Sequence, residues 1–325
     1  MKNISKKIVK LTILGLVIVL FQACSVKVPI SDTKTSNMNY SNSNNDKKMN
    51  VQFESSLNKS HSVSTGKLTK VFLLEHNNKT IDANSFIKAS LEKELRARNL
   101  ILNFDEISED KLILEDFEIL THRASGFSPL VTISTLKVKL KSNNESKIIV
   151  SMIKRAKVPV WSIDEIHEPC YNEPTTLLIK EIVAKINRLY FGYKFTDEYI
   201  KQLESKILNP ENERLTYIDV YELGFSNNLK VVSFLKELTN SNAQYIRLAA
   251  ISSIGTLGDA TQFDFLVSLN KNSKMWQDRA MALKSIGDLG TEEAYNYLKE
   301  RKSFWKGQTT QEALWNLKIL NLYLD

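Results

Sequence analysis

The sequence has few of the residues that most often carry enzyme chemistry. Among its 325 residues there are only two cysteines, Cys24 and Cys170, and four histidines. It contains no GxSxG nucleophile elbow, no glycine-rich loop that could hold a phosphate, and no HExxH zinc motif. These absences remove the usual sequence signatures of hydrolases, metalloproteases and nucleotide-binding enzymes. We therefore predict a protein that is not an enzyme and that uses no cofactor.

The sequence also lacks a hydrophobic run long enough to cross a bilayer. The apolar stretch at 11–21 is shorter than the roughly 20 residues that a membrane-spanning helix needs. Lysines precede it, the small residue Ala23 follows it, and a polar sequence rich in Ser and Asn comes next. This order predicts a secretory signal peptide at residues 1–23.

The segment LFQAC at 20–24 resembles the lipobox of bacterial lipoproteins. The resemblance implies that signal peptidase II cuts before Cys24 and that the Cys24 sulfur carries a diacylglyceryl anchor. It also implies sorting to the outer membrane, facing the periplasm, because Ser25 rather than aspartate follows the cysteine. Secretion without a lipid is the alternative. With Cys24 lipidated, Cys170 has no partner for an intramolecular disulfide.

Positive charge is concentrated in the part that is removed. The formal charge is +7, of which +4 belongs to the lysines of the signal peptide, so the mature chain carries +3. A charge this small does not predict a nucleic-acid partner. Residues 24–65, dominated by Ser, Asn and Lys, have too few apolar residues to form a core, and we predict a lipidated N-terminus followed by a disordered tether.

Residues 66–200 alternate between strand and helix patterns and predict a small α+β domain with an antiparallel sheet and two packed helices. Its predicted strands lie at 68–76, 111–120, 131–141 and 147–161, and its predicted helices lie at 82–99 and from Pro174 onward. The order resembles that of the compact domains of outer-membrane and transport-auxiliary lipoproteins.

Residues 201–325 are purely helical in pattern and contain an internal repeat. RLAAISSIGTLG, from Arg247 to Gly258, aligns without gaps to RAMALKSIGDLG, from Arg279 to Gly290. Each block is followed by an aromatic–Leu pair in a second short helix. This pattern resembles HEAT repeats, in which stacked helix pairs form a solenoid that mostly binds other proteins. The repeated glycines suit the turn that ends each first helix.

Three groups of residues are candidates for a functional site. Arg247, Arg279 and Trp276 could line a groove for a protein partner, although each arginine could instead pair with an acid such as Asp259 or Asp278 and hold neighbouring repeats together. A second group could contact lipid from a basic two-stranded ribbon: Lys137, Lys139, Lys154 and Arg155, with Lys141 and Lys157 beside them. The same lysines could simply keep an outer strand solvated.

The third group, His167 and Cys170, lies in the polar segment WSIDEIHEPCYNEP, which we predict to be a loop. The two residues form at most half of a metal site, so we predict no metal. A cysteine nucleophile would need this loop to bend sharply. The sequence thus favours a lipid-anchored, non-enzymatic scaffold in the cell envelope that binds a periplasmic or outer-membrane protein through its repeats. The alternative is a transport auxiliary that touches lipid or lipopolysaccharide through the basic ribbon.

Overall fold

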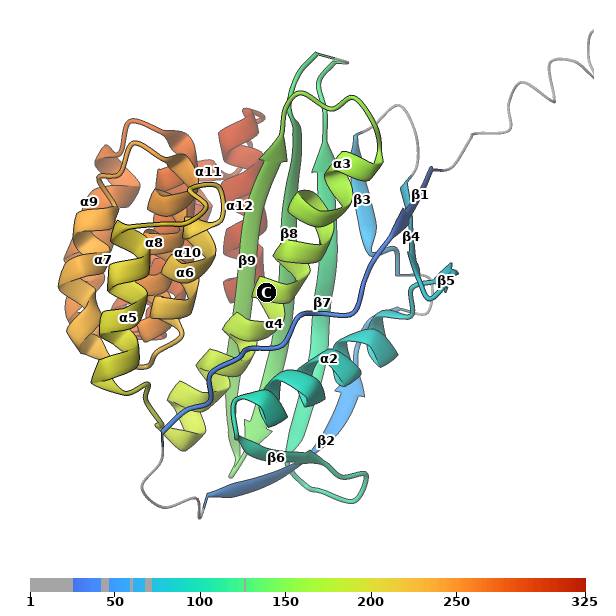
Figure 1. Ribbon diagram of the computed structural model, residues 1–325, viewed down its shortest axis with the longest axis vertical. Helices are drawn as coiled ribbons and strands as arrows, with labels where there is room; N and C mark the ends of the chain where they lie inside the picture. Colours follow the sequence, from blue (N-terminus) through green and yellow to red (C-terminus); the bar gives the residue numbers. More distant parts are fainter. Residues whose placement is uncertain (1–25, 42–46, 59–60, 68–71, 126) are drawn as a thin grey trace, which may run out of the picture.

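The computed structural model describes residues 26–41, 47–58, 61–67, 72–125 and 127–325. The predicted signal peptide and Cys24 lie outside these residues. Two parts are visible in Figure 1, a sheet with helices on one face and a stack of helices against the edge of that sheet. None of the described helices is both long enough and apolar enough to cross a membrane.

The main sheet has the strand order β6-β2-β7-β8-β9, with β3 pairing alongside β7. Its long antiparallel strands β7, β8 and β9 confirm the three predicted between residues 111 and 161, whereas β2, β3 and β6 pair in parallel. The sheet is therefore mixed rather than antiparallel. Its strands are β2 (Lys48–Ser55), β3 (Ser64–Lys67), β6 (Ile101–Phe104), β7 (Lys111–His122), β8 (Leu130–Ser142) and β9 (Glu145–Lys157).

The alternating residues of β8 explain why the antiparallel hairpin of β8 and β9 forms where the sequence predicts it. Leu136, Val138 and Leu140 are completely buried on one face, as a period of two requires. The β8–β9 turn is closed by Asn143 and Asn144, which both take positive φ. Asparagine tolerates that conformation better than most residues, so the turn fixes the register of the two strands.

The predicted tether is wrong for the described part of residues 26–65. The described residues begin with β1 (Val26–Pro29), which pairs in parallel with β4 (Phe72–His76), and β4 pairs with β5 (Lys79–Thr80) to complete a small second sheet. β2 and β3 belong to the main sheet. The apolar residues here are few, but Val28, Tyr40 and Val51 are buried in the shared core. The composition of this segment does not predict their burial, because the core that covers these residues is formed by the rest of the chain.

Helices α2 (Ala83–Ala97) and α4 (Glu173–Ile186) cover one face of the main sheet (Figure 1). Asp82 caps the start of α2, since its side chain accepts a hydrogen bond from the Asn84 amide. Both helices were predicted from the sequence. The predicted loop before α4 is wrong, since α3 (Asp164–Ile166) and a wide helical turn at His167–Asn172 lead directly into α4.

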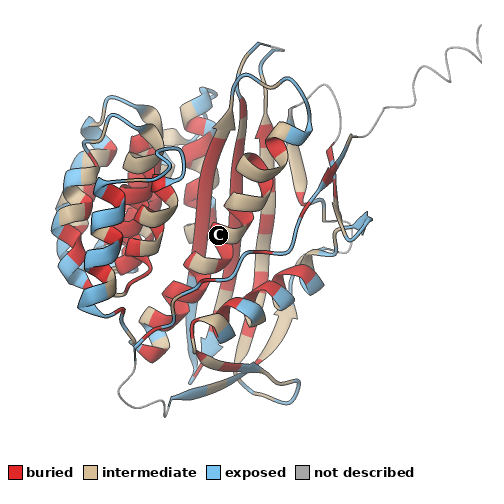
Figure 2. Cartoon of the chain, viewed as in Figure 1, coloured by how far each residue is buried: buried red, intermediate tan, exposed pale blue. Residues whose placement is uncertain are grey.

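The helical stack consists of paired helices, and its first helices form an inner row. That row is α6 (Thr216–Gly224), α8 (Gln244–Leu257), α10 (Trp276–Leu289) and α12 (Gln311–Leu324). The outer helices are α7 (Val232–Leu238), α9 (Phe263–Asn272) and α11 (Glu292–Trp305), and α5 (Asp197–Leu208) precedes the stack. In Figure 2 the inner helices α8 and α10 are mostly buried, whereas α5, α7 and α9 carry the exposed surface. The fold class, α+β followed by a helical repeat, is confirmed.

Candidate functional site

The repeated blocks hold the inner helices together through a serine and a glycine in each. Ser253 on α8 donates a hydrogen bond to the Val220 carbonyl on α6, and Ser285 on α10 donates one to the Ile251 carbonyl on α8. A methyl group on Gly255 would lie 2.6 Å from the Cα of Ser285, so only glycine permits this approach. Gly258 takes a φ of +66° where α8 ends, as predicted. The role of Gly255 could have been inferred from its recurrence at Gly287.

The two repeat arginines occupy equivalent positions. The Nε of Arg247 lies 2.9 Å from the Asp278 carboxylate, and the Nη2 of Arg279 lies 2.6 Å from the carboxylate of Glu312. Each arginine also donates to carbonyl groups in the turn before its own helix, Arg247 to Ser241 at 2.9 Å and Arg279 to Ser273 at 2.7 Å. The arginines therefore link each turn to the next inner helix, and the predicted pairing of Arg247 with Asp278 is confirmed.

A groove runs beside these arginines, along the turns that precede α8 and α10. It has a volume of about 960 Å³ and is open to solvent. Its lining combines side-chain amides with one half-exposed apolar residue, Met275, and the Arg247–Asp278 pair forms part of the wall. The lining residues are Thr239, Asn240, Ser241, Asn242, Gln244, Arg247, Ser268, Leu269, Asn272, Ser273, Lys274, Met275, Gln277 and Asp278. Trp276, predicted with the arginines, does not line this groove.

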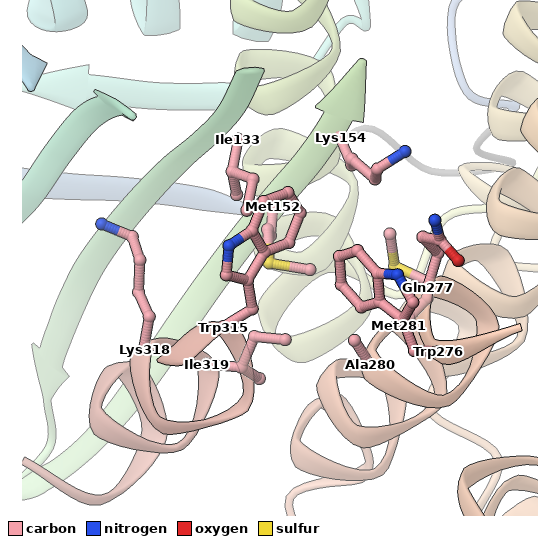
Figure 3. Close-up of a pocket in the computed structure, with 10 residues that line it drawn as sticks. All are labelled: Ile133, Met152, Lys154, Trp276, Gln277, Ala280, Met281, Trp315, Lys318 and Ile319. Carbon is pink, nitrogen blue, oxygen red and sulfur yellow. The ribbon is translucent and has the colours of Figure 1, made fainter. Parts of the chain in front are cut away.

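Trp276 instead lies in an apolar pocket between the repeats and the sheet (Figure 3). Its ring meets that of Trp315 edge to face with centroids 4.6 Å apart, and Met152 of β9 and Met281 of α10 complete the contact. The free volume is about 10 Å³, close to that of a single water molecule, so these side chains fill the space. This pocket is a packed junction rather than a ligand cavity.

The basic ribbon predicted to contact lipid is not an exposed surface. Lys154 and Arg155 are 8% and 7% exposed, respectively. The Lys154 ammonium lies over the ring of Tyr245. Burial, with a further contribution from Arg155, lowers the pKa of Lys154 to about 8. Lys137 is also buried, and both Lys137 and Lys139 pair with Glu115, at 3.2 and 2.6 Å. The prediction is wrong because the helical stack covers this edge of the sheet.

Arg155 connects four elements at that edge. Its guanidinium lies 4.1 Å from the ring centroids of both Tyr217 on α6 and Tyr245 on α8. It also lies 3.4 Å from the carboxylate of Glu173 at the start of α4, which accepts a hydrogen bond from the Tyr217 hydroxyl as well. A guanidinium between two rings gains a cation–π interaction on each side, and these interactions strengthen when water is excluded.

A second junction is a fully buried network of charges between α4 and α10. Glu181 of α4 accepts from Lys284 of α10 and from Lys185 of its own helix at 2.7 Å, and Lys185 lies 2.6 Å from Asp288 of α10. Lys284 lies 2.7 Å from Asp288 as well, which closes a ring of two acids and two lysines. The ring is electrically balanced, which is the condition under which buried charges are tolerated.

The pKa values of the ring follow from these contacts. Burial by itself would raise the pKa of Glu181, but attraction to Lys185 and Lys284 outweighs it and lowers that pKa to about 2. For Lys284, burial opposes the charge and the two acids outweigh it, so its pKa is raised. Both groups are therefore charged at neutral pH although both are buried.

His167 and Cys170 are not arranged as a site. Cys170 is buried in the core, and burial raises the pKa of its thiol to about 12, which keeps it protonated at neutral pH. The Nδ1 of His167 lies 3.9 Å from Asp164. Within the residues that the structure describes, no group of three or more His, Cys, Asp or Glu side chains is placed to hold a metal ion.

Comparison with known proteins supports the helical part. Residues 223–318 match the family of HEAT repeats. A solved structure described as "Crystal structure of uncharacterized protein" shares 8% identity and a TM-score of 0.30, over 51% of this chain and 97% of that chain. That likeness is too low to carry an argument. No curated protein matches the sequence. The C-terminal part of the chain thus contains HEAT-like repeats, an architecture consistent with a protein-interaction scaffold.

Proposed function

We propose that this protein is a non-enzymatic lipoprotein of the cell envelope, anchored through Cys24 in the outer membrane and facing the periplasm, where its repeats bind a protein partner. The anchor and the location rest on the lipobox resemblance at 20–24 and on Ser25. The binding role rests on the HEAT-like repeats and on the groove beside Arg247.

The observation that carries the binding role is the position of the groove. The sheet and α4 cover the inner row of helices, so that row is occupied by the chain itself. The turns before α8 and α10 remain open. Asparagine and glutamine side chains can both donate and accept hydrogen bonds, which suits them to the backbone of an extended polypeptide segment, and Met275 offers an adaptable apolar contact.

A crosslinking experiment tests the binding role. The full chain and a Met275→Glu variant are expressed in the native host, crosslinked at the membrane and purified. Met275 is 44% exposed, so the substitution should keep the fold while placing a charge inside the groove. Tyr295→Glu is the matched control, because Tyr295 is 43% exposed on α11 and does not line the groove.

The proposal expects one partner that is recovered with the wild type and with Tyr295→Glu and that is lost with Met275→Glu. Equal recovery of every partner from both variants would contradict a role for the groove. A point variant is a better probe than removal of the repeats, since truncation would expose Glu181 and Lys185. The anchor is tested separately with labelled palmitate, whose incorporation should disappear in Cys24→Ala.

A further inference from the structure

One end of the main sheet carries large apolar side chains that nothing in the described chain covers. Trp161 is 84% exposed and Phe127 is 98% exposed, and Val158 and Ile163 are also exposed. Val158, Trp161 and Ile163 lie in the segment between β9 and α3, and Phe127 lies between β7 and β8. Exposed aromatic residues gathered at one end of a fold indicate an interaction site.

The strand register places these two segments at the same end. Leu130 pairs with Lys157, so the residues just before β8 and just after β9 leave the sheet side by side. His122, the last residue of β7, pairs with Val131 at that end. Figure 1 shows both connections at the top of the molecule. We call this end of the sheet, with Phe127, Val158, Trp161 and Ile163, the aromatic end.

The described chain begins on the side of the aromatic end. Val26 pairs with Phe72, whose ring lies 6.4 Å from that of Tyr171. The Tyr171 hydroxyl lies 3.2 Å from the hydroxyl of Thr121, which is one residue before the end of β7. In Figure 1 the first residues of β1 lie in the same upper part of the molecule as α3.

We infer that the aromatic end rests on the surface of the lipid bilayer, with Trp161 in the interfacial layer. The inference rests on the proposed lipid anchor at Cys24. A single residue, Ser25, separates Cys24 from the first strand, so an anchor at Cys24 holds this end of the fold close to the headgroups. Tryptophan favours that layer because its ring is apolar and its N–H can still meet water.

Bromolipid quenching tests this orientation. The mature chain starting at Cys24 is coupled through that thiol to a maleimide phospholipid in phosphatidylcholine vesicles that carry bromine atoms near the headgroup. Cys170 is buried and does not compete for the maleimide. Because the lipid is attached chemically, the result is independent of whether Cys24 is acylated in the cell, which palmitate labelling decides.

Two variants, compared with the wild type, locate the quenched fluorophore. Trp161→Phe removes the signal from the aromatic end and leaves Trp276, Trp305 and Trp315 in the repeats. The control adds Ile107→Trp to Trp161→Phe. Ile107 is 89% exposed, but it lies between β6 and β7, at the opposite end of the sheet.

The inference expects tryptophan quenching in the wild type and its loss in Trp161→Phe, without recovery in the control. It also expects about a tenfold weaker binding of the uncoupled chain to vesicles after Trp161→Ala, the effect of removing one aromatic contact. The inference is overturned if the wild type is not quenched, or if a tryptophan at position 107 is quenched as strongly as Trp161.

Discussion

Replacing Glu181 by glutamine should destabilise the whole fold, because this carboxylate balances two buried lysines. Glu181 contacts Lys185 and Lys284 and accepts hydrogen bonds from Ser151 at 2.6 Å and from Thr256 at 3.1 Å. Glutamine has nearly the same shape, so the substitution removes the charge and leaves little cavity. The ring would then hold two lysines and one acid, Asp288.

Removing one partner of a buried ion pair costs about 3–5 kcal/mol of the free energy of unfolding. The pKa of Glu181 falls from an ordinary 4.5 to about 2 on folding, and such a shift corresponds to about 3 kcal/mol. Because the folded pKa is the lower one, this contribution is present above about pH 4.5 and is lost as the pH falls toward 2.

Urea unfolding of the mature chain at pH 7 measures the effect, and a charge-balanced double variant provides its control. Lys284→Met in the Glu181→Gln background leaves Lys185 facing Asp288. The double variant should therefore lose about 1–3 kcal/mol less free energy of unfolding than the two single variants lose in sum. Glu181→Gln should also lose less stability than the wild type between pH 5 and pH 2. A loss below about 1 kcal/mol, or simple additivity, would refute the role given to the ring.

Three other predictions follow from the packing. Gly255→Ala should lower the free energy of unfolding by about 2 kcal/mol, because the added methyl group meets the backbone of α10. Gly290→Ala should lower it by about 1 kcal/mol, because the surroundings of Gly290 are open and only its left-handed backbone is unfavourable for alanine. Equal losses in urea titrations would argue against the close approach of α8 and α10. Arg155→Leu should lower the free energy of unfolding by about 3 kcal/mol, because it removes two cation–π contacts and leaves the Glu173 carboxylate without its guanidinium partner. An unchanged thermal midpoint would contradict this. In a Cys24→Ala chain, Cys170, whose thiol pKa is raised to about 12 by burial, should resist iodoacetamide at pH 8 until the protein is unfolded, and rapid labelling of the native protein would disprove its burial.

The parts of the fold that local patterns determine were predicted from the sequence. Three such patterns predicted the element that the structure has. They are the alternation in β8, the apolar stripe of α2 and the spacing of Arg247 and Arg279, and each depends on residues that are near one another in the chain. The HEAT-like repeats were identified for the same reason, because a recurring unit is a local pattern.

The parts that depend on distant partners were not predicted. β2 pairs in parallel with β7, which lies more than fifty residues further along the chain, and nothing in its Asn-rich surroundings indicates this partner. Lys154 and Arg155 look like surface residues in the sequence because their tyrosine partners, Tyr217 and Tyr245, lie in the repeats. For the same reason the basic ribbon, predicted as the alternative site, is buried by the repeats, and Trp276, predicted with Arg247 in the partner groove, lies in a packed junction instead.

The central claim is that the sheet and the HEAT-like repeats form one cooperative unit, which leaves the turn groove free for a partner. Equilibrium unfolding of a chain with Cys24→Ala and Trp161→Phe tests it, with the remaining tryptophans reporting on the repeats and alkylation of Cys170 reporting on the sheet. The account predicts the same denaturant midpoint for tryptophan fluorescence and for Cys170 labelling. Two separate midpoints would contradict it.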